Sequence, residues 1–264
     1  MGPQENQPME KKMSEEKAMR EKRAFDELRP IKIQTDYLDY ADGSAFLEIG
    51  KTRVVAAATI EDKAPPFLKG MGKGWVTAEY SMLPRSTEKR NIRERTAGRV
   101  SGRTQEIQRL IGRSLRAVTD LAVLGERTII LDCDVIQADG GTRAASITAG
   151  CVALAMALKK LLDEKVIDEM PLKHLVSGVS VGIVGGETLL DLDYNEDSQA
   201  GIDMNVVETD RGQLVEVQAT AEKEPFSRKE LMDLLRLADK GIKELIQIQK
   251  AALKRKSLLF MAYG

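Results

Sequence analysis

The sequence predicts an α+β protein built from two βαβα-type halves with mixed sheets and packed helices. Two observations predict this class. Runs with strand-like alternation and runs with helical spacing follow one another along the chain. The order strands, helix, strand, helix is then followed by further strands and a helix. No clear internal sequence repeat accompanies the second series, so the relation between the halves depends on the order of elements alone.

Length and composition fit a globular protein with one large domain or two fused halves. The 264 residues are 42% hydrophobic and 31% charged, and the formal net charge is −1. This balance argues against attraction of the whole molecule to nucleic acid, although a local patch can still provide it. We expect no apolar stretch as long as a membrane span and no membrane partner. The N-terminus lacks the apolar core of a secretory signal.

In the first half, strand-like runs fill residues 31–80, with turn signals at residues 42–43 and 48–51. A helix is expected next, because one face carries residues at helical spacing: Ile107, Leu110, Ile111, Ser114, Val118 and Leu121. A buried strand over residues 128–136, a glycine turn and an apolar helix that ends near Leu162 follow.

In the second half, strands are expected over residues 176–184, 188–194, 204–208 and 214–219. The last amphipathic helix begins after Ser227, because this residue is a good N-cap and Glu230 stands three residues further on. The inward face of this helix carries Leu231, Leu234, Leu235, Ala238, Ile242, Leu245 and Ile246.

The glycine turn between the buried strand and the apolar helix is a candidate anion site. Gly140 and Gly141 allow a tight turn and a close approach of backbone to ligand. The free N–H groups at the start of the helix favour a negative charge, and phosphate is the natural guest. Thr142 adds a hydroxyl group and Arg143 adds a planar pair of donors. The alternative is an ordinary turn with Arg143 as a solvated cap.

A strong local excess of arginine lies between residues 85 and 116. The loop-like segment 85–102 favours binding along a nucleic-acid backbone, because arginine recognises phosphate by geometry. For Arg109, Arg113 and Arg116, which share one stripe of the predicted helix, a solvated face with ion pairs between subunits is favoured instead.

An acidic stretch covers residues 191–205. Asp191 and Asp193 alternate along a predicted strand and are expected to share a face. Glu196, Asp197 and Asp203 bracket a short loop between two strands, which brings carboxylates together. Hard oxygen ligands of this kind suit Mg²⁺ or Mn²⁺ acting with substrate phosphates. The alternative is an acidic turn without a metal.

Cysteine and histidine contribute little to the predicted chemistry. Cys133 and Cys151 lie in apolar surroundings and form no ligand pattern, so we expect reduced, buried thiols in a cytoplasmic protein. His174 is the only histidine, beside two leucines, and is expected to be structural. Histidine-based triads and the usual zinc sites are therefore not expected.

Taken together, these motifs resemble the ribonuclease PH family of phosphate-dependent 3′→5′ exoribonucleases. The resemblance runs from about residue 20 to residue 253. The matching stretches are residues 25–33, 67–80, 82–87, 101–117, 131–143, 196–198 with 203–207, and 215–218. This match favours the phosphate interpretation of the glycine turn.

The resemblance implies a fold, a reaction and a set of site residues. It implies the fold of that family and reversible phosphorolysis that trims 3′ ends of tRNA precursors and other RNA, with release of nucleoside diphosphates. Inorganic phosphate is then the co-substrate and Mg²⁺ or Mn²⁺ the metal. It also implies a homohexameric ring, a trimer of dimers. The implied residues are Arg103, Gly141, Thr142 and Arg143 for phosphate, Asp197 and Asp203 for catalysis and metal, and Arg85, Arg90, Arg93 and Arg99 for RNA.

The chain also departs from the family pattern. The family opens with Arg-x-Asp-Gly-Arg, whereas this chain has Arg20-Glu-Lys-Arg23. Ser81 and Gly201 replace a common glycine and a common glutamate, and Gly201 is expected to loosen the acidic loop. We therefore expect a disordered extension over residues 1–18, one catalytic domain over residues 19–254, and a tail over residues 255–264.

Two other functions fit parts of the sequence. The first is a ring subunit that binds RNA without cutting it, as some exosome-type relatives do; the retained phosphate and metal residues count against it. The second is a Mg²⁺-dependent enzyme of small phosphorylated metabolites, which has no need of the arginine-rich loop.

Overall fold

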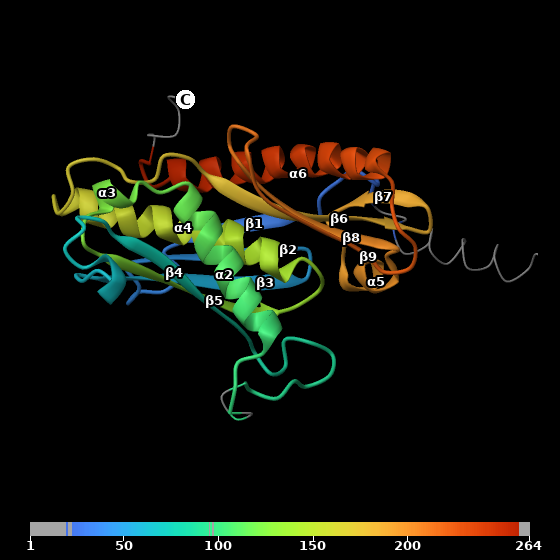
Figure 1. Ribbon diagram of the computed structural model, residues 1–264, viewed down its shortest axis with the longest axis horizontal. Helices are drawn as coiled ribbons and strands as arrows, with labels where there is room; N and C mark the ends of the chain where they lie inside the picture. The colour runs from blue at the N-terminus through green and yellow to red at the C-terminus, as the bar shows by residue number, and fades with distance from the viewer. Residues whose placement is uncertain (1–19, 21–22, 95, 97, 259–264) are drawn as a thin grey trace, which may run out of the picture.

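A computed structural model describes residue 20 and residues 23–94, 96 and 98–258 of the chain. The predicted extension over residues 1–18 lies outside the described residues, as does the tail from residue 259 onward. Two sheets and the helices packed on them make up the body of the protein (Figure 1), which confirms the α+β class.

The first sheet has five strands in the order β1-β2-β3-β5-β4. Adjacent strands in this sheet are antiparallel, except that β4 and β5 run parallel to each other and are joined through helices. Its elements are β1 (Ile31–Thr35), β2 (Gly43–Ile49), β3 (Thr52–Glu61), the short helix η1 (Pro66–Leu68), β4 (Trp75–Met82), α2 (Gly102–Ala117), α3 (Leu121–Leu124) and β5 (Thr128–Gln137).

The second sheet has four antiparallel strands in the order β7-β6-β8-β9. Its elements are β6 (Val176–Val184), β7 (Glu187–Leu190), α5 (Tyr194–Gln199), β8 (Ile202–Thr209), β9 (Leu214–Ala221) and α6 (Arg228–Lys254). Ser227 and Glu230 form the predicted capping box of α6, because each side chain bonds the backbone N–H of the other residue.

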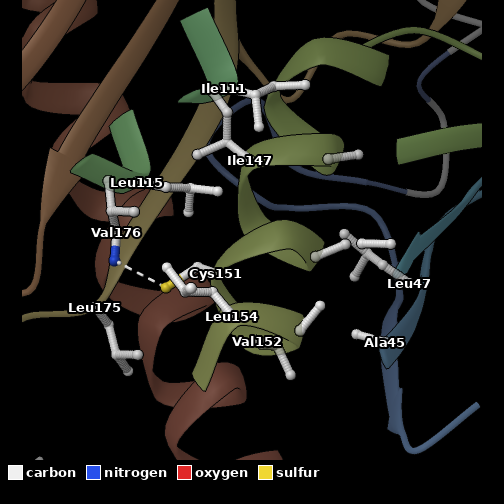
Figure 2. Close-up of a cluster of buried hydrophobic side chains, with 14 of the residues drawn as sticks. Ala45, Leu47, Ile111, Leu115, Ile147, Cys151, Val152, Leu154, Leu175 and Val176 are labelled. Carbon is white, nitrogen blue, oxygen red and sulfur yellow. Dashed lines mark hydrogen bonds between the residues drawn. The ribbon is translucent and has the colours of Figure 1, made fainter. Parts of the chain in front are cut away.

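Helix α4 (Thr142–Asp163) forms the centre of the core, where it packs on β2 and β3 of one sheet and on β6 of the other. In Figure 2, side chains of α4 meet those of α2 and of the segment that enters β6 on one side and those of β2 on the other. Full burial of each large aliphatic side chain there stabilises the fold by about 1.5–3 kcal/mol. The amide of Val176 also donates to the Sγ of Cys151 at 3.5 Å.

The expectation that no apolar stretch reaches the length of a membrane span is wrong for α4. Among the described residues, α4 is the one helix whose length and composition would allow it to span a membrane. However, 83% of its most apolar window is buried inside the protein. Because two sheets cover it, α4 must be apolar on nearly all sides, and this is the reason for its composition.

The acidic stretch does not form the predicted strand over residues 188–194. Strand β7 ends at Leu190, and Asp191 then adopts a left-handed conformation with φ of 55°. Asp193 caps α5 and accepts from two backbone N–H groups, so it does not share a strand face with Asp191. The predicted short loop before Asp203 therefore contains a helix, and Asp197 lies on that helix.

Candidate active site

The glycine turn has the geometry that an anion site requires. Gly140 and Gly141 have φ of 76° and 66°, and α4 begins at Thr142. In the described part of the chain no side chain caps this helix start, so its first N–H groups remain available to a ligand. A Cβ on Gly140 would lie 2.3 Å from the carbonyl oxygen of Leu192, so only glycine allows the turn to pack there.

Side chains from distant segments hold this turn in place. The Oγ1 of Thr52 donates to the carbonyl of Gly140 at 2.7 Å and accepts from the amide of Asp139 at 3.0 Å. Arg29 donates from its Nη1 to the carbonyl of Asp139. Thr52 and Arg29 are both buried, so water competes less for these part-buried bonds. The turn is therefore fixed before any ligand binds.

Arg29 is itself fixed by Asp191. Its Nε and Nη2 donate to the two carboxylate oxygens at 2.9 and 2.7 Å, and its backbone N–H donates at 2.9 Å. Burial raises the pKa of Asp191, but the hydrogen bonds and charge of Arg29 outweigh this and hold that pKa below its ordinary value. These contacts also maintain the left-handed backbone of Asp191, a strained conformation for a residue other than glycine.

The shortened N-terminal motif joins the same cluster. Arg23 donates to the carboxylates of Asp191 at 3.3 Å and Glu196 at 3.1 Å. The Nε of Arg20 lies 3.4 Å from the Oε1 of Glu196. Glu196 also completes the capping box of α5. The departure from the family pattern at residues 20–23 thus keeps arginine contacts to the helix that carries Asp197.

The side chains of Thr142 and Arg143 have partners on two strands, and one of these partners in turn contacts α2. The hydroxyl of Thr142 lies 2.9 Å from that of Tyr80 on β4. Arg143 donates to the side-chain oxygen of Gln218 on β9, whose amide donates to Glu106 on α2 at 2.6 Å. Sequence analysis assigned no role to Tyr80, Gln218 or Glu106. No local pattern indicates them, although the stretches that resemble the family contain all three.

Asp197 and Asp203 lie in the same electrostatic environment. Burial raises the pKa of Asp203 to about 6, and the charge of Asp197 adds to this rise. Burial also raises the pKa of Asp197. The positive charges of Arg143 on α4 and Arg103 on α2 oppose this rise of the pKa at both carboxyl groups. Predicted phosphate residues on α2 and α4 therefore act on predicted metal residues on α5 and β8.

These two carboxylates fit a divalent cation. The Oδ1 of Asp203 is buried and has no hydrogen-bond partner among the described residues. Such an atom costs free energy unless a cation or water satisfies it. In the described ranges no group of three or more His, Cys, Asp or Glu side chains is placed to hold a metal. Mg²⁺ suits this arrangement, because it commonly uses one or two carboxylates together with waters and substrate phosphates.

Gly201, which stands where the family commonly has glutamate, lies between these two aspartates in the sequence. Its amide donates to the carbonyl of Ile183 at 2.8 Å, and its carbonyl accepts from the amide of Glu222 at 2.9 Å. Both bonds tie the loop to neighbouring strand ends. Sequence analysis missed Glu222, whose charge raises the pKa of Asp197 and Asp203.

The arginine-rich segment forms a long loop between β4 and α2 that projects from the body of the protein (Figure 1). Ser86 is buried at the base of this loop, where its carbonyl accepts from the amide of Ala138, next to the glycine turn. The four predicted RNA-binding side chains are all exposed: Arg85, Arg90, Arg93 and Arg99. The contact of Ser86 therefore places the start of the loop beside the glycine turn.

The helix stripe of arginines differs in part from the prediction. Arg116 is half-buried, donates to the carbonyl of Val76 at 2.7 Å and lies 4.1 Å from the centre of the Trp75 ring, so it is only partly solvated. Arg113 forms its ion pair within the chain, with Glu216. His174 bonds Asp210 at 3.0 Å, in agreement with a structural role.

Both cysteines are free and buried, as predicted. Burial raises the pKa of both thiols, that of Cys151 to about 12. Neither is therefore a nucleophile at neutral pH.

Comparisons with known proteins agree with this geometry. Residues 27–160 match the model of the 3′ exoribonuclease family, domain 1, and residues 174–241 match domain 2. The chain is 62% identical over 231 residues to ribonuclease PH of Moorella thermoacetica. These residues make up 88% of this chain and 92% of that protein.

Solved structures share the fold at low identity. Rrp46 of rice (Oryza sativa) has a TM-score of 0.71 and 21% identity, over 88% of this chain and 99% of that one. A chain of the Archaeoglobus fulgidus exosome with RNA bound to the active site has a TM-score of 0.72 and 20% identity. The match covers 92% of this chain and 99% of that chain. Since both family domains match and a curated relative is 62% identical, the chain belongs to the ribonuclease PH family of phosphorolytic 3′→5′ exoribonucleases.

Proposed function

We propose that the glycine turn and the two aspartates form the phosphorolytic centre of this exoribonuclease, and that it trims the 3′ ends of tRNA precursors and other RNA. One observation carries the assignment of the centre. The charges of Arg103 and Arg143 act on the carboxyl groups of both Asp197 and Asp203, which supports one site with donors for phosphate and ligands for a cation. A hydrolase needs a positioned water, whereas this site offers donors for an anion.

The residues of the chain act on a phosphate nucleophile. Arg103, Arg143, the hydroxyl of Thr142 and the N–H groups of the turn orient inorganic phosphate in line with the last phosphodiester. An oxygen of the phosphate forms a bond to the phosphorus of the terminal nucleotide, and the bond from that phosphorus to the preceding 3′ oxygen breaks. The products are a nucleoside diphosphate and an RNA shortened by one nucleotide. The bonds formed and broken are similar in energy, so the reaction runs in both directions.

The aspartates provide the negative charge for a metal. Asp197 and Asp203 would hold Mg²⁺ or Mn²⁺, which when bound neutralises charge on the reacting phosphoryl group and on the leaving 3′ oxygen.

Incubation of the protein with a 3′-extended RNA, with and without inorganic phosphate, tests the proposed function. We expect nucleoside diphosphates only when phosphate is present. RNA binding without any product would favour the silent ring subunit. Failure to bind single-stranded RNA in a salt-dependent way would favour an enzyme of small metabolites.

Removal of one ligand charge tests the metal site. We expect Asp203→Asn and Asp197→Asn each to lower activity by at least about tenfold, because loss of even an outer partner of a metal site costs roughly 10- to 100-fold. RNA binding should persist in both variants. Activity titrated against Mg²⁺ and Mn²⁺ measures the effect, and Asp193→Asn, at the half-buried N-cap of α5, serves as a control for loss of one acidic charge. Full activity of both variants without a divalent cation would reduce the acidic stretch to a structural turn.

We propose further that the protein assembles into a homohexameric ring, a trimer of dimers, in which the projecting loops line the opening for RNA. One chain has a net charge near zero, but a ring gathers several copies of the exposed loop arginines around one strand. The chain's likeness to an exosome chain supports a ring. Two free, buried thiols are in keeping with a cytoplasmic location, which we also propose.

Paired substitution of loop arginines tests the role of the ring. We expect Arg90→Ala with Arg93→Ala to weaken binding of a long structured RNA much more than binding of a short oligonucleotide that reaches only the active site. Binding measured over a range of salt should also show a smaller slope for the long RNA, because fewer phosphates are neutralised. Equal losses on both RNAs, or a monomer in sedimentation with full activity on long RNA, would contradict guidance by the ring.

A further inference from the structure

Tyr80 places a buried hydroxyl group at the start of the phosphate turn. It lies on the inner face of β4 and is 4% exposed. Its oxygen is 2.9 Å from the Oγ1 of Thr142, and no other described residue bonds it. Two hydroxyl groups thus share one hydrogen bond at the first residue of α4.

The chemistry of the two groups decides which one donates. A buried O–H without an acceptor is unfavourable, and the acceptor available to Tyr80 is Thr142. A phenol is also a better donor than an aliphatic alcohol, because it is the stronger acid. Tyr80 therefore donates to Thr142, and the Thr142 proton must point in another direction.

Other hydroxyl groups on α4 show what is different about Thr142. Ser146 donates to the carbonyl of Thr142 at 2.9 Å, so its proton is used inside the helix. The hydroxyl of Thr148 lies 3.0 Å from the carbonyl of Ala144 and 2.8 Å from the hydroxyl of Ser177, so its proton also has partners within the protein. Thr142 is the first residue of α4 and makes no such bond among the described residues. Its proton remains available to a ligand on the turn.

We propose that Tyr80 is a positioning residue: by donating to Thr142, it directs the Thr142 hydroxyl proton toward an oxygen of the phosphate nucleophile. This inference rests on the proposed phosphate site. Burial raises the pKa of Tyr80, so the phenol stays a neutral donor, while the charges of Arg103 and Arg143 oppose this rise. The action of both guanidinium groups on the phenol places it in the same positive region as the two aspartates.

The variant Tyr80→Phe keeps the ring and removes the hydroxyl. Without its donor, the Thr142 hydroxyl is free to rotate, and about 0.5–1.5 kcal/mol of one hydrogen bond is at stake, which corresponds to roughly 2- to 10-fold. We expect the KM for phosphate to rise by that factor, while kcat at saturating phosphate and the KM for RNA stay unchanged. In the reverse direction, the KM for a nucleoside diphosphate should rise equally. Tyr37→Phe, on an exposed ring stacked on Phe46, is the control and should change none of these values.

A double-mutant cycle separates positioning from a general structural effect. In a Thr142→Val background, Tyr80→Phe should cause no further loss, because the hydroxyl through which it acts is absent. Calorimetric titration of the protein with inorganic phosphate alone should give the same factor in Kd without any catalysis.

Each outcome decides the inference. An unchanged phosphate Kd in Tyr80→Phe overturns it, as does an equal further loss in the Thr142→Val background. Wild-type protein that binds phosphate but does not cut RNA would refute the proposed function, whereas the Kd of Tyr80→Phe would still decide the role of Tyr80. Wild-type protein that binds no phosphate would overturn both.

Discussion

Replacing Arg143 by Ala is expected to slow phosphorolysis by roughly 30- to 1000-fold while the fold stays intact. Arg143 stands at the start of α4, where its guanidinium offers two donors to one anion and its charge also acts on Asp197 and Asp203. Loss of a charged donor that stabilises developing charge costs about 2–4 kcal/mol in the transition state. The measurement is kcat/KM for phosphate, together with the thermal midpoint of unfolding.

Arg113→Ala is the matched control for this experiment. Arg113 is also an arginine with a partner on β9, the half-buried Glu216, but it has no place in the proposed phosphate site. We expect it to keep the wild-type rate. The assignment of Arg143 would fail if its variant reacted at the wild-type rate at low phosphate, or if both variants lost activity equally.

Replacing Arg29 by Met should lower the free energy of unfolding by about 3–5 kcal/mol. Arg29 and Asp191 are 7% and 4% exposed, so the change leaves a buried carboxylate without its main partner. It also removes the donor to Asp139 in the phosphate turn. Denaturant titration measures the loss, and phosphate binding should weaken with it because the turn is no longer fixed. The control Arg113→Met breaks an ion pair whose side chains are 48% and 24% exposed, and it should cost less than about 1 kcal/mol.

The same pair should give a pH dependence with a defined sign. The folded-state pKa of Asp191 lies below its unfolded value, so its contribution to stability is present above the unfolded pKa, near 3.9. It is lost as the pH falls through the lower, folded-state pKa. When unfolding is measured at a series of acidic pH values, the free energy of unfolding should therefore fall less steeply with decreasing pH in Asp191→Asn than in the wild type. Identical slopes in the two proteins would mean that Asp191 is not stabilised as a carboxylate.

Local patterns were enough to predict several elements and part of the site. The prediction of a strand over residues 176–184 is confirmed, and the capping box at Ser227 was visible because its two partners stand three residues apart. The glycine turn was equally visible, since Gly140, Gly141 and the start of α4 follow one another in the chain. Where the residues that fix a conformation are neighbours in sequence, the pattern contains the information.

The acidic stretch was misread for the opposite reason. Asp191 alternates with Asp193 as a strand residue would, but its conformation is set by Arg29, which is 162 positions away. A pattern of alternating side chains cannot reveal a buried guanidinium from another segment, so β7 was predicted too long and α5 was missed.

The sequence by itself determined the α+β class, the glycine turn before α4 and, through resemblance, the family and its chemistry. Only the tertiary structure decided what holds that chemistry in place: Thr52 and Arg29 behind the turn, Gln218 beside Arg143, and Tyr80 against Thr142. These contacts join residues that are tens of positions apart or more. Their partners are chosen by packing of two sheets around α4, a property of the whole fold that no local pattern expresses.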